Sequence, residues 1–452
     1  MIAPRTMVEG VRSLLPGHWM RVDSKGRIVE VCRYWRLPRD VASSAEPRGS
    51  GREILECLKE SVRLRLVSDV PLGVFLSGGL DSSTIVAVVR QAKGEVKTFS
   101  VAFEEATYDE SASARWVAKH FETDHTEVRL RREDFWGWLP EALAAMDQPS
   151  FDGVNTYCVA KTARASGLTV ALSGLGSDEV FGGYPFFNSV PRLLPLAVLA
   201  DRCPPRSLSL ARDWLNRHCR QTAGSWKSLE ILYGAGENGG GTAPLAAYQT
   251  AQLLFPSWVR SRLLAPSLAL RPPAVWFGLP REFLDFMQEE EADETLPERL
   301  SRYTLRLFLG ERCLRDTDTM SMGVSLEVRA PFTDHLLIEA LWRIPGTTRC
   351  GGAPDKPFEW DLVRSLLGED YPLRKKQGFI FPFEEWLHNK AIRDAILDPL
   401  ADRQLTAGIG LQHEAVQEIA NRFVRRKGPI PWSRIWSLFV LLHWCQQHRV
   451  SL

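Results

Sequence analysis

The sequence lacks the features that mark several common protein classes. Its longest apolar runs, LLPLAVLA and SLFVLLHW, fall well short of the roughly 20 residues that a membrane-spanning helix needs. The first residues, MIAPRTMVEG, contain no apolar leader segment. The 8 cysteines form no CxxC pair and have no histidine at metal-ligand spacing. These absences predict a cytoplasmic protein with reduced cysteines and no membrane partner.

The sequence also lacks an excess of charge of either sign. It has 56 basic residues (Lys and Arg) and 55 acidic residues (Asp and Glu), for a formal net charge of +1. Such a balance provides no general attraction to nucleic acid or to an anionic membrane surface. We therefore expect no nucleic-acid partner, and any ligand has to be bound by a local site.

The length and the pattern of the chain predict more than one domain. With 452 residues and 44% hydrophobic content the chain can bury a large core. Residues 1–37 read as a short β-hairpin around a DSKG turn, and residues 38–50 as a Pro/Ser/Gly-rich linker. Residues 51–452 form the main domain, in which 190–310 is a variable and mostly helical segment.

The first part of the main domain alternates between helical and strand patterns. Short apolar strands are expected at 71–77, 96–103, 125–130 and 168–174, with amphipathic helices between them. Strands that alternate with helices of ten or more residues indicate crossover connections and a parallel sheet. The predicted fold class is therefore α/β with a helical C-terminal part, whose Trp-rich last helix contributes aromatics to the core.

The stretch GVFLSGGLDSSTIVAVV, residues 73–89, has the composition of a phosphate-binding loop. It ends a predicted strand and begins a helix, where free backbone N–H groups favour an anion. Gly78 and Gly79 allow close approach to phosphate, and Ser77, Ser82 and Ser83 add hydroxyl donors. An ordinary glycine-rich turn would explain the two glycines but not the whole Ser-Gly-Gly-Leu-Asp-Ser-Ser string.

Two details of this loop indicate the kind of phosphate chemistry. It has no lysine of the kind that a Walker-type loop places on the β and γ phosphates. Asp81 would repel bare phosphate, so its position makes sense if a Mg²⁺ ion bridges it to a nucleotide. The pattern therefore predicts attack at the α-phosphorus of ATP with pyrophosphate as the leaving group.

Four motifs in order resemble a known family. LSGGLDSS resembles the pyrophosphate loop of the N-type ATP pyrophosphatases, and VALSGLGSDEVFGGY (170–184) resembles the second signature of their asparagine synthetase branch. RDTDTMSMGVSLEVRAPFTDHLLIEAL (315–341) and RKKQGFIFPFEEWL (374–387) are similar to its two C-terminal signatures. The resemblance implies a parallel-sheet ATP-pyrophosphatase fold over residues 51 to about 390.

The resemblance also implies cofactors and site residues. The family adenylates a carboxylate with ATP and Mg²⁺, and ammonia then displaces AMP to give an amide. Asp81 and Asp178 would hold Mg²⁺, Lys376 would stabilise charge on the phosphates, and Arg329 would be a further catalytic residue. The residues expected at the nucleotide are Phe75, Leu76, Ser77, Gly78, Gly79, Asp81, Ser82, Ser83, Val101, Ser173 and Gly174.

Structural alternatives exist for three of these residues. Asp178 in GSDEVF has the sequence context of a helix N-cap. Lys376 in RKKQ could be one more surface lysine. Arg329 and Glu327 could instead form a buried structural ion pair.

The sequence departs from the family pattern at two places. Family members have a glutamate in the second signature that orients or deprotonates the incoming ammonia, and Leu175 stands at this position. Family members also begin with a glutaminase domain whose N-terminal cysteine is the nucleophile. Here Ile2 follows the first methionine, and residues 1–37 resemble only the last strands of that domain. We therefore expect a chain that cannot hydrolyse glutamine by itself.

These observations leave several functions open. The leading interpretation is an ammonia-dependent asparagine synthetase, with aspartate as the carboxylate and with a separate glutaminase subunit as an alternative nitrogen source. The second is amidation, lactam formation or macrocyclisation of another carboxylate, such as a peptide or a sugar acid. The third is a truncated, non-catalytic family member. A homodimer is compatible with all three.

Overall fold

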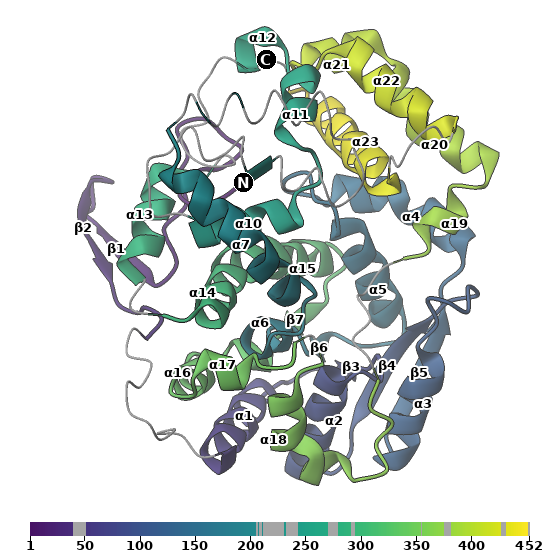
Figure 1. Ribbon diagram of the computed structural model, residues 1–452. Coiled ribbons are helices and arrows are strands. Elements are labelled where there is room, and N and C mark those ends of the chain that lie inside the picture. The colour runs from purple at the N-terminus through teal and green to yellow at the C-terminus, as the bar shows by residue number, and fades with distance from the viewer. Residues whose placement is uncertain are drawn as a thin grey trace.

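The computed structural model describes most of the chain. The described residues are 1–38, 51–204, 207, 210, 230–231, 243–269, 279–290, 294–353, 355–374, 381–425 and 431–450. They form a body that contains a parallel sheet with helices, a helical C-terminal part, and a two-stranded ribbon that extends from the body (Figure 1). The linker expected at 38–50 lies outside the described residues except for Pro38.

A five-stranded parallel sheet forms the centre of the body, as the sequence predicts. Its strand order is β5-β4-β3-β6-β7, and every neighbouring pair is parallel. The four expected strands are present, and the fifth, β7, was not predicted because it has only three residues within a mostly helical region. The strands are β3 (Leu72–Phe75), β4 (Lys97–Ala102), β5 (Asp124–Arg129), β6 (Val170–Leu172) and β7 (Glu327–Arg329).

Helices account for most of the remaining described residues. Among them, no helix is both long and apolar enough to cross a membrane. In the first half they are α1 (Gly51–Arg65), α2 (Leu80–Lys93), α3 (Ser111–His120), α4 (Arg132–Ala144), α5 (Gly153–Ala165), α6 (Ser177–Phe181), α7 (Phe186–Arg202), α10 (Ala243–Gln252), α11 (Ser257–Leu263), α12 (Pro266–Ala269) and α13 (Arg281–Glu290). In the second half they are α14 (Leu296–Tyr303), the π-helix η2 (Thr304–Cys313), α15 (Leu314–Met322), the 3₁₀-helix η3 (Pro331–Thr333), α16 (His335–Trp342), α17 (Gly346–Arg349), α18 (Pro357–Leu367), α19 (Phe383–Trp386), α20 (Lys390–Ala401), α21 (Arg403–Gly408), α22 (His413–Val424) and α23 (Trp432–Gln447).

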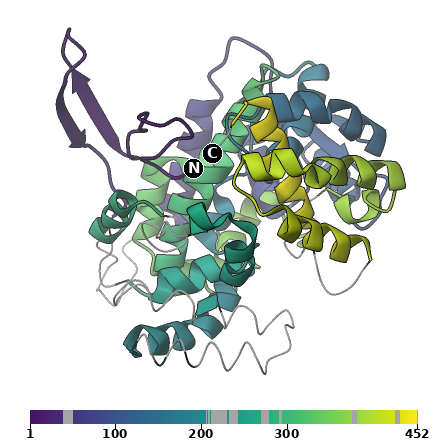
Figure 2. The same ribbon diagram turned by 90° about the horizontal axis from the view of Figure 1, so that it is seen from above.

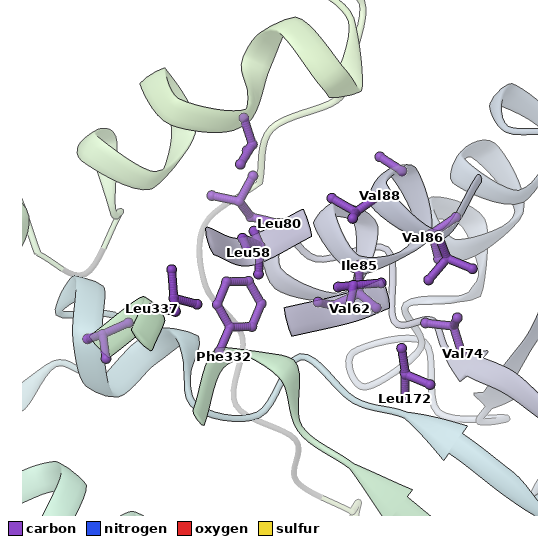
Figure 3. Packing of buried hydrophobic residues seen from close by; sticks show 14 of the residues in the cluster. Leu58, Val62, Val74, Leu80, Ile85, Val86, Val88, Leu172, Phe332 and Leu337 are labelled. Atoms are coloured by element: carbon purple, nitrogen blue, oxygen red, sulfur yellow. The ribbon is translucent and has the colours of Figure 1, made fainter. Parts of the chain in front are cut away.

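Helix α1 shows how the apolar pattern builds the core. Ile54, Leu58 and Val62 recur every four residues and are fully buried, so one stripe of the helix faces the protein interior. They belong to a cluster that includes Phe332 and side chains from α2, β3 and β6 (Figure 3). This packing fixes the sheet from which the loops after β3 and β6 extend.

The C-terminal helix α23 supports a loop of the body. Trp436 and Trp444 are buried, which confirms that these aromatics belong to the core. The indole N–H of Trp436 donates to the Phe151 carbonyl at 2.9 Å, and that of Trp444 donates to the Met146 carbonyl at 3.1 Å. The last helix therefore fixes both ends of the segment between α4 and α5.

The N-terminal hairpin forms the ribbon, with β1 (His18–Val22) antiparallel to β2 (Ile28–Arg33). It extends away from the rest of the chain in both views (Figures 1 and 2). Of the 21 large hydrophobic residues that are exposed in the described structure, 12 lie in residues 1–34. Such a concentration of exposed apolar side chains is typical of an interaction surface.

Candidate functional site

The candidate site lies where two neighbouring parallel strands end. The loop after β3 leads into α2, and the loop after β6 leads into α6. From β3 the chain proceeds to β4 on one side, while β6 lies on the other side, so this is the point where the strand order reverses. Ligands of open α/β sheets bind at this type of position. The sheet therefore brings the first and second sequence motifs together.

Two glycines make the close packing of these loops feasible. Gly174 packs against the first loop, and a Cβ built on it would lie 2.8 Å from the Asp81 Cβ and 3.1 Å from the Ser82 nitrogen. Gly78 has a φ of +79°, and a Cβ there would lie 2.5 Å from the backbone of Ser113. Gly174 is thus required where the two loops meet, and Gly78 is required where the first loop meets α3, in addition to any role toward a ligand.

Hydroxyl groups organise the first loop. The Ser77 amide donates to Ser82 Oγ at 3.2 Å, and the Gly79 amide donates to Ser77 Oγ at 3.2 Å. From the segment after α18, the Tyr371 hydroxyl contacts the Gly78 carbonyl at 3.1 Å and Ser83 Oγ at 3.2 Å. Tyr371 thereby connects the loop to a distant part of the chain, and burial raises the pKa of its hydroxyl to about 12, which keeps it a donor.

Asp178 lies in the first turn of α6 rather than at its cap. The N-cap is Gly176, which has a left-handed backbone with φ of 103°, and Asp178 is the second residue of the helix. The alternative prediction, in which Asp178 is the N-cap of a helix, is therefore wrong. Its side chain is 10% exposed, so a buried carboxylate is presented beside Asp81.

The two aspartates converge on one positive group, the ammonium of Lys356. Its Nζ forms an ion pair with Asp81, lies 3.1 Å from Asp178 Oδ1, and lies 2.8 Å from Glu359 Oε2. It also donates to Ser177 Oγ at 3.1 Å. Asp81 and Asp178, which the sequence predicts to share a cation, are thus held within reach of a single cation.

Among the described residues, this cluster contains more acidic than basic side chains. Three carboxylates, from Asp81, Asp178 and Glu359, surround one ammonium, and the Lys356 and Glu359 side chains are 3% and 0% exposed. Burial raises the pKa of Glu359 to about 7, with Lys356 opposing the shift. Burial lowers the pKa of Lys356, but the surrounding carboxylates outweigh it and raise the pKa well above its usual value.

Sequence reasoning did not identify Lys356 or Glu359. They lie in GGAPDKPFEW, just before and at the start of α18, far from the two loops in sequence. Lys356 is the N-cap of α18 with a left-handed φ of 49°, and Pro357 begins the helix. The only local signal is this lysine before a helix-starting proline, which by itself predicts a turn. The contact with Asp81 requires the tertiary fold.

The other predicted nucleotide residues lie near the ends of the same strands. Phe75 ends β3 and contacts the Phe99 ring edge to face at a centroid distance of 6.2 Å. Leu76 is buried directly after this strand, and Val101 is partly buried in the last part of β4. After β6, the Ser173 amide donates to the Arg329 carbonyl at 2.8 Å. Their contact with a nucleotide stays a prediction.

Of two further residues with a predicted catalytic role, the structure describes one. Lys376 lies outside the described residues. The Arg329 guanidinium pairs with Glu327 at 2.7 Å and donates to the carbonyls of Arg65 and Val67 at 2.8 and 2.7 Å. The structure thus shows the expected ion pair, although Glu327 is half-exposed rather than buried. These bonds connect β7 to the segment that follows α1.

Leu175 follows Ser173 and Gly174 in the second loop. Its amide contacts Ser173 Oγ at 3.3 Å, and its half-buried side chain packs against the main core cluster. A hydrocarbon side chain cannot accept a proton. At this position the loop therefore contributes packing and no base.

The donor set at the two loops fits a hard divalent cation. Oxygen ligands from carboxylates and phosphates are those that Mg²⁺ takes, and it usually uses one or two carboxylates with substrate phosphates. In the part of the chain that the structure describes, no group of three or more His, Cys, Asp or Glu side chains forms a metal site by itself. Asp81 and Asp178 would be the protein ligands, and a nucleotide would complete the set.

Comparison with known proteins agrees with this geometry. The family model described as asparagine synthase matches residues 53–446. An asparagine synthetase (glutamine-hydrolyzing) of Bacillus subtilis is 27% identical over 419 residues, which is 90% of this chain and 62% of the relative. A putative asparagine synthetase of Mycobacterium tuberculosis is 26% identical over 454 residues, 98% of this chain and 65% of the relative.

A relative with a different name matches equally well. The amidase chyE of Penicillium rubens is 27% identical over 471 residues, 95% of this chain and 67% of the relative. The chain spans about 60 to 65% of the length of the first asparagine synthetases that it matches. The match to the family model covers both loops and the Lys356 segment, and on this basis the chain belongs to the asparagine synthase family.

Proposed function

We propose that this protein is an ATP-dependent ligase that converts a carboxylate into an amide through an acyl-adenylate. The observation that carries the proposal is the convergence of Asp81 and Asp178 on one cation position at the end of β3 and β6. A carboxylate pair behind a lysine-free phosphate loop fits Mg²⁺-bound pyrophosphate better than γ-phosphate transfer. The family match supports the same chemistry.

Each step has a role for residues of this chain. An oxygen of the substrate carboxylate attacks the α-phosphorus, the bond to the β-phosphate oxygen breaks, and pyrophosphate leaves. Backbone amides and hydroxyls of the first loop would hold the pyrophosphate, while Mg²⁺, when bound, would neutralise charge between it and the aspartates. The ammonium of Lys356 adds positive charge beside the loop, and we propose Lys376 as a second cation. Ammonia then attacks the acyl carbon and AMP departs.

Aspartate is the carboxylate that we propose first, because relatives from Bacillus subtilis and from Mycobacterium are named asparagine synthetases. Leu175 supports a second candidate. Since it cannot take the proton that ammonia loses, either another group or water accepts that proton, or the acid differs from aspartate. The match to a protein named as an amidase favours amidation of another carboxylate, such as a peptide or sugar acid.

Free ammonia is the proposed nitrogen source, and a separate glutaminase subunit is the alternative. The observation that favours the alternative is the N-terminal ribbon, whose exposed apolar side chains include Met20, Val29 and Val31. Two strands alone are marginally stable in water, and no further strand pairs with either edge of this hairpin in the described part of the chain. Such a ribbon suits a partner that contributes further strands.

The proposal is tested by pyrophosphate release. The purified protein is incubated with MgATP, ammonium and a panel of carboxylates including aspartate, and products are identified by mass spectrometry. We expect AMP and pyrophosphate with one of the acids, and loss of at least about 100-fold in rate for Asp178→Asn, because removal of a transition-state charge contact costs this much. Asp361→Asn, an exposed change on α18, is the matched control. Formation of ADP, or no turnover with any acid, would refute the proposal.

A further inference from the structure

Lys356 occupies the place between the two aspartates that a metal ion would need. Its Nζ lies 3.1 Å from Asp178 Oδ1 and is also paired with Asp81. Mg²⁺ binds carboxylate oxygen directly at about 2.0–2.1 Å. An ammonium at its present distance from Asp178 fills the space into which such an ion has to move, and the two positive charges would repel each other.

We infer that the ammonium of Lys356 takes the place of the metal ion in the nucleotide-free protein. There it neutralises Asp81 and Asp178, and it is displaced when MgATP binds. The inference rests on the proposed function, because it takes the two aspartates to be the metal ligands. It concerns the state before the reaction. Without a cation, two buried carboxylates side by side would destabilise the loops by mutual repulsion.

The structure also provides a place for the displaced ammonium. Glu359 Oε2 lies 2.8 Å from Lys356 Nζ, and Ser177 Oγ lies 3.1 Å from it. The second carboxylate oxygen of Glu359, Oε1, is buried and has no hydrogen-bond partner in the described part of the chain. A buried acceptor without a donor is costly. Glu359 Oε1 therefore offers a hydrogen-bond acceptor to the ammonium as it moves away from the aspartates.

The movement requires only the lysine side chain. The backbone of Lys356 is fixed at the start of α18, where Pro357 occupies the first helical position. The flexible four-carbon stem of lysine can shift its ammonium between neighbouring carboxylates while the helix stays in place. Glu359 lies three residues further along the chain, within the same helix, so its carboxylate stays close to the Lys356 stem while the ammonium moves.

The consequence is an order of binding. Free metal has to displace the ammonium without compensation, whereas a metal that arrives with a nucleotide brings phosphate oxygens that complete its coordination. We therefore expect weak binding of free metal and tight binding of the metal–nucleotide complex. Replacing Lys356 with a neutral side chain should reduce this selectivity by strengthening the binding of free metal.

The test measures metal binding rather than turnover. Mn²⁺ without nucleotide is titrated into the protein, and free Mn²⁺ is followed by electron paramagnetic resonance. We expect Lys356→Met to bind Mn²⁺ at least about tenfold more tightly than the wild type, which corresponds to about 1.4 kcal/mol. Lys390→Met, a change of an exposed lysine, is the matched control and should behave as wild type.

Two further variants keep the test decisive. Lys356→Gln substitutes for the methionine variant if that protein fails to fold, as judged by its melting temperature. Asp178→Asn placed on the Lys356→Met background should remove the gained site. Equal Mn²⁺ affinity of wild type and both lysine variants would overturn the inference. A tighter site in a protein that releases no pyrophosphate would instead reject only the proposed function.

Discussion

Gly174 provides a direct test of whether the two loops form one site. A Cβ at this position would lie 2.8 Å from the Asp81 Cβ, 3.1 Å from the Asp81 carbonyl carbon and 3.1 Å from the Ser82 nitrogen. Two of these three atoms belong to the backbone, so no side-chain rotation relieves the contact. In Gly174→Ala the second loop has to move away from the first, which separates Asp81 from Asp178.

The size of the effect follows from the steric contact. Inserting a methyl group into a packed contact typically costs about 1–3 kcal/mol. For a chain of this size we expect the melting temperature to fall by several degrees. If the same distortion weakens the contacts to MgATP by a similar amount, the dissociation constant rises about 10- to 100-fold.

Calorimetry with MgATP and a thermal melt provide the two measurements. The matched control is Gly137→Ala, because a Cβ at Gly137 in α4 would meet nothing within 4 Å. Alanine for glycine within a helix should stabilise the protein by about 0.5–1 kcal/mol and leave MgATP binding unchanged. Wild-type affinity and stability in Gly174→Ala would refute the contact between the loops.

Three further predictions concern the surroundings of the site. Burial raises the pKa of Glu359 from 4.5 to about 7, so the folded state holds a proton that the unfolded state has released, and the free energy of unfolding falls as pH rises through this window. Melting temperatures measured over this pH range should fall less steeply with pH in Glu359→Gln than in the wild type. An unchanged slope would show that Glu359 is not the group responsible. Arg349 is fully buried and its guanidinium donates to the Val180 carbonyl at the end of α6. Urea unfolding of Arg349→Met should therefore show a loss of about 1–3 kcal/mol, because this buried carbonyl loses a donor. The double change Val29→Lys and Val31→Lys on the exposed ribbon should alter the free energy of unfolding by less than about 0.5 kcal/mol and leave ammonium-dependent pyrophosphate release unchanged; a large loss of stability would show that this face packs against the body.

Much of the fold could be predicted because its determinants are local in sequence. The strands β3 to β6 are short apolar runs between helices with a clear helical period, and this alternation specifies a parallel sheet. Strand β7 was missed because Glu327–Arg329 is too short to show a period of two and carries charge at both ends. Its assignment depends on pairing with β6, which is a tertiary event.

The residues of the candidate site also fall into those that the sequence predicts and those that depend on the tertiary fold. Asp81 and Asp178 follow two strands, and the rule that parallel strands end at one edge of a sheet is sufficient to bring them together. Lys356 and Glu359 follow no strand, and no periodicity links them to the loops. The packing of α18 against α2, α1 and α17 brings them there. Among the described residues, Lys356 and Lys390 both stand at a helix start after the second signature, so this feature by itself does not distinguish Lys356.

The loop after β6 leads into the short helix α6, which needs support from distant segments of the chain. Its five residues cannot be stable alone, since isolated helices of this length do not form in water. Ser301 donates to the Glu179 carbonyl at 2.6 Å from α14, and Arg349 donates to the Val180 carbonyl from α17. These bonds satisfy carbonyls at the end of α6 and so fix the helix that carries Asp178. The ammonium of Lys356 forms an ion pair with the Asp178 carboxylate. The position of Asp178, which we propose as a metal ligand, therefore depends on α14, α17 and the start of α18 as much as on the two loops that the sequence identifies.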